Sequence, residues 1–143
     1  MYRKILVALE NGPADETLVA HVTELAKRLG SELLLLHVAD GWAARNYDQL
    51  KLAESEEIKA DRAYLERAAE KIRGAGLTVT TQLALGNPPQ EILKIAQAGH
   101  CDLIAMGSHG HRLIGDIIHG STIHEVRHKS SIPVLLVRAE KKL

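Results

Sequence analysis

The sequence lacks an excess of charge of either sign. Its 143 residues include 18 lysines and arginines and 18 aspartates and glutamates, so the formal net charge is zero. Domains that bind nucleic acid or anionic membrane surfaces usually carry a clear excess of basic residues. The balanced charge therefore predicts that neither nucleic acid nor a membrane is a partner.

Cysteine and long apolar runs are also scarce. Cys101 is the single cysteine, which excludes an internal disulfide and is typical of a reducing compartment. It directly precedes an apolar run, so we expect a packed thiol and not a reactive one. No stretch reaches the roughly 20 apolar residues of a membrane span, and Glu10 interrupts the first apolar run before it could form a signal-peptide core. These features predict a cytoplasmic protein.

The two commonest nucleotide-binding loops are missing as well. Neither GxxxxGKS/T nor GxGxxG occurs in the chain. Their absence argues against a P-loop NTPase and against a dinucleotide-binding enzyme.

Short apolar runs instead alternate with helix-like segments along the chain. We expect strands over residues 4–9, 32–38, 78–85, 103–106 and 134–138, with helices between them and the last helix over about 119–129. Pro13 suits a first helical position, Asp15 favours the positive end of that helix, and Gly30 ends it. The order predicts one α/β domain over residues 1–143, with an open parallel sheet and helices on both faces.

Residues 102–122 combine a short apolar strand, a glycine-punctuated loop and the start of a helix. Gly107 is expected to end the strand, and Gly110 and Gly120 to leave backbone N–H groups uncovered, because glycine has no Cβ. Ser121 and Thr122 stand where a helix N-cap belongs, and there hydroxyls, N–H groups and the helix dipole suit a phosphate. The stretch therefore predicts a phosphate-binding loop.

Residues 107–121 follow the pattern Gly-x2-Gly-x9-Gly-Ser, before a strand that starts at Ile132-Pro133. With this pattern the chain resembles the universal stress protein family, and more narrowly the branch whose members bind ATP. The resemblance extends to the segments at residues 4–9, 33–40, 86–93, 101–110 and 130–138. It implies a Rossmann-like, adenine nucleotide alpha hydrolase-like fold with strand order 3-2-1-4-5.

That strand order implies a crevice between the ends of the first and fourth strands, where ligands of open α/β sheets bind. In the family an aspartate at the end of the first strand contacts the nucleoside, and here Glu10 keeps the carboxylate with one more methylene. Val38 matches the position whose backbone meets the adenine, and Ala8 matches another crevice position. The resemblance carries the phosphate contacts over to Gly107, Gly110, Gly120, Ser121 and Thr122.

The predicted loop also contains His109, His111 and Arg112, which could supply positive charge to a triphosphate in place of a P-loop lysine. The implied ligand is ATP, or AMP or ADP, and a Mg²⁺ or Mn²⁺ ion bridging the phosphates is compatible with any such site. No carboxylate cluster marks a metal site of the protein's own.

A second motif points elsewhere. Residues 124–128 read HEVRH, which matches the HExxH signature of zinc proteases on a predicted helix. The glycine and third histidine of the extended signature are missing, and little chain follows His128 to supply another ligand. Glu125 also stands three residues after Thr122, where a capping-box partner belongs. We therefore predict no metal site here.

The function predicted from these features is that of an ATP-binding protein of the cytoplasmic stress response. The alternatives are a slow ATPase, autokinase or nucleotidyl transferase using the same crevice, or a nucleotide-free dimeric scaffold. No positioned base and nucleophile can be recognised, so binding is favoured over turnover and no catalytic residue is predicted. The resemblance also implies a homodimer through the fifth strand, residues 134–138, whose apolar edge would otherwise be bare.

Overall fold

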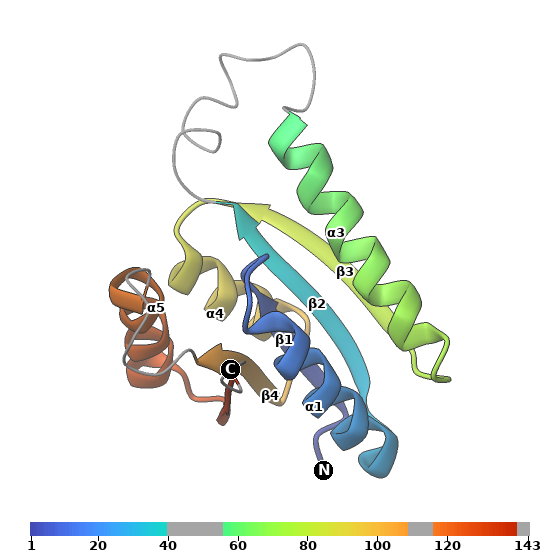
Figure 1. Ribbon diagram of the computed structural model, residues 1–143. Helices are drawn as coiled ribbons and strands as arrows, with labels where there is room; N and C mark the ends of the chain where they lie inside the picture. Colours follow the sequence, from blue (N-terminus) through green and yellow to red (C-terminus); the bar gives the residue numbers. More distant parts are fainter. Residues whose placement is uncertain (40–55, 109–115, 140–143) are drawn as a thin grey trace.

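The computed structural model of the protein describes residues 1–39, 56–108 and 116–139 (Figure 1). All its strands pair in parallel, in the order β3-β2-β1-β4-β5, so the predicted strand order and α/β class are confirmed. None of the described helices combines the length and apolar character that crossing a membrane requires. The elements are β1 Lys4–Leu9, α1 Asp15–Leu29, β2 Glu32–Ala39, α3 Glu56–Arg73, β3 Val79–Leu85, α4 Pro88–Ala98, β4 Leu103–Ser108, α5 Asp116–Lys129 and β5 Val134–Arg138.

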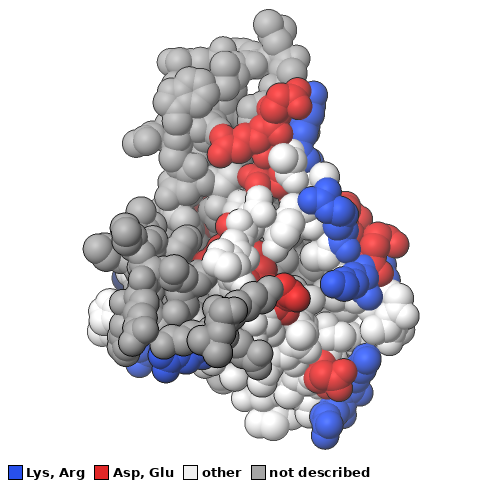
Figure 2. Space-filling view, viewed as in Figure 1, with Lys and Arg blue, Asp and Glu red and all other residues white. Residues whose placement is uncertain are grey.

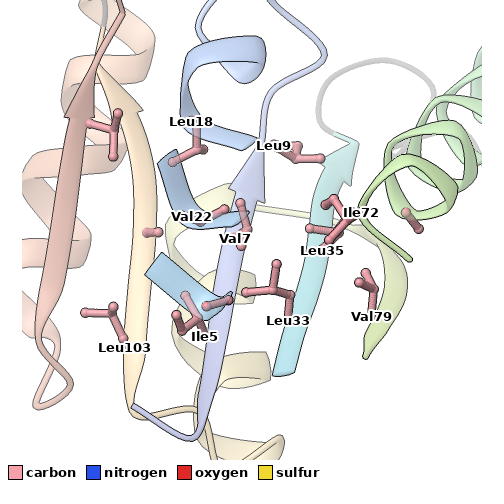
Figure 3. Packing of buried hydrophobic residues seen from close by; sticks show 14 of the residues in the cluster. Ile5, Val7, Leu9, Leu18, Val22, Leu33, Leu35, Ile72, Val79 and Leu103 are labelled. Carbon is pink, nitrogen blue, oxygen red and sulfur yellow. The ribbon is translucent and has the colours of Figure 1, made fainter. Parts of the chain in front are cut away.

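The central strand β1 buries both of its faces, as its continuous apolar run predicts. Successive side chains of a strand point to opposite faces, so Val7 and Leu9 pack with α1 and α3, whereas Leu6 and Ala8 pack with α4 and α5. Figure 3 shows the first of these two layers, in which Leu18 of α1 lies over the strands. The sheet is therefore covered by helices on both sides.

Several helix signals act where the sequence places them. Gly30 follows α1 with a φ of 69°, in the left-handed region that glycine enters without strain. The Asn87 side chain accepts a hydrogen bond from the backbone N–H of Gln90 at 3.4 Å and caps α4. Pro13 is not the first residue of the helix as predicted, because α1 begins at Asp15 and the proline lies in the preceding turn.

Cys101 lies between α4 and β4 and is 5% exposed. Burial raises the pKa of its thiol, so the reactive thiolate is disfavoured. The expectation of a packed thiol is confirmed.

Two predicted boundaries near the glycine-rich stretch are wrong. β4 continues through Gly107 to Ser108, because β5 pairs with it over that length and Gly107 stands opposite Val137. α5 begins at Asp116, so Gly120, Ser121 and Thr122 lie inside the helix and are not its N-cap. A glycine within a helix costs only about 1 kcal/mol relative to alanine, so Gly120 does not delay the helix start.

Candidate functional site

The sheet has a switch point between β1 and β4. The chain leaves β1 into α1 on one face of the sheet and leaves β4 toward α5 on the other (Figure 1). Where the connections that follow two neighbouring strands go to opposite faces of the sheet, the carboxyl ends of those strands open a crevice that commonly holds the ligand. The geometry thus places a candidate site at the edge predicted from the resemblance.

The turn from β1 to α1 is organised by a buried carboxylate. Asp15 is 3% exposed, and its oxygens accept hydrogen bonds from the backbone N–H groups of Glu10 at 3.0 Å, Asn11 at 2.8 Å and Gly12 at 3.4 Å. The Tyr64 hydroxyl of α3 donates to the same carboxylate. Burial and this hydrogen bond raise the pKa of Tyr64, so it remains a donor. Because a side chain already occupies these N–H groups, the turn is not a phosphate-binding loop.

A second set of contacts ties the ends of β1 and β2 to α3. His37 Nδ1 lies 2.8 Å from the carbonyl oxygen of Leu9 and must carry the proton, since a carbonyl oxygen only accepts. His37 Nε2 lies 3.5 Å from Oδ2 of Asp61, whose Oδ1 accepts from the Asn11 side chain at 3.1 Å. Asp61 is 7% exposed, so these contacts lie in a largely dry environment.

A pocket of about 230 Å³ opens beside these contacts, at the carboxyl ends of β1 and β2. Its carboxylates accept hydrogen bonds and repel anions, so it suits hydroxyl or amino groups better than phosphates. Acidic side chains also gather where α3 begins (Figure 2). The pocket is lined by Glu10, Asn11, His37, Val38, Ala39, Glu57, Ile58 and Asp61.

The structure brings two predicted site residues together in this pocket, Glu10 and Val38. Ala8 is 8% exposed on the α4 and α5 side of β1. Ser121 is exposed and Thr122 partly buried on α5. His109, Gly110, His111 and Arg112 lie outside the described residues, so their predicted roles stay predictions.

Gly107 has a packing role that the glycine pattern did not indicate. A Cβ at this position would lie 3.0 Å from the Cβ of Ala14, at the start of α1. Ala14 is itself 1% exposed and has little room to move. The glycine therefore lets α1 approach β4, whether or not it also contacts a ligand.

Sequence reasoning missed the roles of Asp15, Asp61 and His37. The sequence predicts only a helix-dipole effect for Asp15, because its hydrogen bonds depend on the shape of the turn. The signal available for Asp61 and His37 was a charged residue on the apolar face of α3 and a polar one within an apolar strand. Buried polar groups need partners, and here the Leu9 carbonyl and the Asn11 side chain provide them, with His37 and Asp61 also in contact with each other.

The described residues contain no group of three or more histidine, cysteine, aspartate or glutamate side chains that could hold a metal ion. In the HEVRH segment of α5, Glu125 pairs with Lys129, with 3.6 Å between the carboxylate oxygen and Nζ. The predicted capping-box role of Glu125 is wrong, because Thr122 lies inside α5 and is not its N-cap.

Comparison with known proteins agrees with this architecture. The universal stress protein family matches residues 1–138. Universal stress protein MJ0577 of Methanocaldococcus jannaschii is 30% identical over 96% of each chain, and its solved structure has a TM-score of 0.82 over 99% of both chains. Two further universal stress proteins share the fold. One, from Archaeoglobus fulgidus, was solved with dAMP (TM-score 0.71, 22% identity, 95% and 98% covered), and another with cAMP (0.74, 18%, 97% and 98%). The chain therefore belongs to the universal stress protein family.

Proposed function

We propose that this protein binds ATP, or a related adenine nucleotide, as a cytoplasmic regulatory protein of the stress response. The observation that carries the proposal is the pocket at the carboxyl ends of β1 and β2, lined by Glu10 and Val38, on the same edge of the sheet as the switch point between β1 and β4. Proteins of the same fold solved with dAMP and with cAMP support an adenine nucleotide as the ligand.

Charge indicates which end of the nucleotide lies in the pocket. The carboxylates of Glu10, Glu57 and Asp61 would repel phosphates but can accept hydrogen bonds from ribose hydroxyls or the adenine amino group. The N–H groups of the β1 to α1 turn are occupied by Asp15. The proposed nucleoside end therefore lies at β1 and β2, and the phosphates extend toward the glycine-rich stretch after β4.

The proposed phosphate contacts come from that stretch and from α5. His109 and Arg112 would supply positive charge, and a Mg²⁺ or Mn²⁺ ion could bridge the phosphates. No candidate metal cluster of the protein's own occurs in the described residues, so such an ion would be held mainly by the nucleotide. Backbone contact is proposed for Gly110 and hydroxyl contact for Ser121 and Thr122. Gly107 and Gly120 lie within β4 and α5, and at these two positions the proposed role is that a missing Cβ lets the phosphates approach closely.

Valine at Gly110 or at Gly120 is expected to abolish ATP binding while the protein stays folded. A branched side chain would cover the backbone at Gly110, and at Gly120 it would keep the phosphates from approaching α5 closely. Isothermal titration calorimetry with ATP measures the loss, and circular dichroism checks the fold. Gly74→Val is the matched control, because Gly74 is exposed at the far end of α3. Wild-type affinity in a folded Gly110 or Gly120 variant would refute the phosphate assignment.

We also propose that two copies associate through β5. This strand is at the edge of the sheet, and Leu136 on it is 38% exposed. A bare apolar edge strand favours pairing with another chain. Light scattering after size exclusion should give a dimer at micromolar concentration, and Leu136→Lys should shift it toward monomer. Leu29→Lys, at a leucine that is 41% exposed on α1, should leave the dimer intact. A monomeric wild-type protein would contradict this proposal.

A further inference from the structure

α5 carries two histidines whose rings lie face to face. His124 and His128 are four residues apart, so they occupy the same side of the helix one turn from each other. Both are exposed, their ring centroids are 6.1 Å apart, and the angle between the ring planes is 7°. The sequence motif indicated the spacing, but only the structure shows that both rings are exposed and parallel.

Two exposed imidazoles one helical turn apart can share one metal ion after their side chains rotate, because each ring nitrogen binds a metal in the plane of its own ring. A neutral ring nitrogen is a good ligand for Cu²⁺, Ni²⁺ and Zn²⁺, at about 2.0–2.1 Å for zinc. The rings stand on one rigid turn, so joining them through an ion requires side-chain rotation and no change of the backbone. Both rings are exposed, which leaves the remaining coordination positions of the ion open to water.

This arrangement differs from a zinc-protease site. Such a site needs a third protein ligand and a glutamate available as a base. Among the described residues no third histidine, cysteine or carboxylate completes a group with this pair, and Glu125 is paired with Lys129. The geometry supports binding of a metal ion by the two histidine side chains. It does not supply the third ligand and the base that metal-dependent hydrolysis needs.

We propose that His124 and His128 form a surface site for a single late first-row divalent ion. Affinity should follow the usual order for nitrogen ligands, with Cu²⁺ bound more tightly than Ni²⁺ or Zn²⁺. The ion would bridge one turn of α5 and stabilise the folded helix, because an unfolded chain does not hold the two rings together. The proposal for this site does not rest on the nucleotide proposal.

The test uses untagged full-length protein. CuCl₂ or NiCl₂ alone is titrated into it, and the heat of binding is measured by calorimetry. We expect one ion per chain at this site and an affinity at least about tenfold weaker in His124→Ala and in His128→Ala, because each loses the chelate. His21→Ala is the matched control, since His21 is exposed on α1, and it should retain wild-type binding. Alanine is a better helix former than histidine, so α5 should persist in both variants.

A second readout is thermal unfolding with and without Ni²⁺. The midpoint should rise with Ni²⁺ in the wild type and in His21→Ala, and should rise less in the two α5 variants. The proposal fails if the α5 variants bind either ion as tightly as wild type, or if the wild type binds neither at millimolar concentration. ATP affinity, measured separately, tests the nucleotide site, so failure of one proposal is distinguishable from failure of the other.

Discussion

Replacing Asp15 by alanine is expected to lower the free energy of unfolding by about 3 kcal/mol or more, since each buried donor left without a partner costs about 1–3 kcal/mol. The carboxylate receives three backbone N–H groups and the Tyr64 hydroxyl, and it is 3% exposed. Water can replace only part of these hydrogen bonds, because Asp15 is buried and Tyr64 of α3 lies against it. Urea unfolding measures the loss of stability, and we expect the m-value to be unchanged.

Three controls identify the cause of that loss. Asp15→Asn keeps the size of the side chain, and its one carbonyl oxygen can accept the hydrogen bonds that Oδ2 receives from Asn11, Gly12 and Tyr64, while its NH₂ group faces the N–H of Glu10; we therefore expect a smaller loss than for alanine. Tyr64→Phe removes one donor and leaves the ring, and should cost about 1 kcal/mol. Glu16→Ala alters the neighbouring exposed acid and should stay within about 0.5 kcal/mol of wild type. An Asp15→Ala protein as stable as Glu16→Ala would show that the carboxylate does not hold the turn.

Gly107→Val is expected to lower the free energy of unfolding by about 2–3 kcal/mol, as overpacking in a closed core does. The first added carbon would already stand 3.0 Å from the Cβ of Ala14, in a layer where Ala14 is 1% exposed. The expected response is a shift of the start of α1 away from β4. Urea unfolding is again the measurement.

A double-mutant cycle separates this packing role from ligand contact. Gly107→Ala should destabilise less than valine, and Ala14→Gly in the same protein should recover most of the loss, because it removes the atom in conflict. Coupling between residues in contact is about 0.5–3 kcal/mol. If the two substitutions add without coupling, packing against Ala14 is not the reason for the glycine. If the stable double variant binds ATP normally, the Gly107 side-chain position does not face the nucleotide.

The strands and helices could be predicted because their signals are local. The apolar run of β1, Gly30 at the end of α1 and the Asn87 cap of α4 each act within a few residues. Strand order came from the resemblance, since apolar runs alone do not say which strands are neighbours. The carboxyl end of β4 and the start of α5 were missed because they depend on pairing with β5 and on helix propagation through Gly120.

The candidate site likewise has a part that could be predicted from the sequence and a part that could not. Glu10 and Val38 are expected at the crevice because the resemblance matches them to family positions, and the structure brings both to one pocket at the carboxyl edge of the parallel sheet. The hydrogen bonds of Asp15, the contact of His37 with Asp61 and the approach of Gly107 to Ala14 join residues from different elements. No spacing in the chain records those distances.

The sequence by itself determined the α/β class, the element order and the family resemblance, because periodicity, caps and ordered motifs are properties of short segments. Only the tertiary structure decided that Gly107 is needed for helix packing, that a buried carboxylate closes the β1 to α1 turn, and that two histidines of α5 stand parallel. The physical reason is that packing and hydrogen bonding depend on distances between atoms of separate elements, and these distances exist only after the sheet and its helices have assembled.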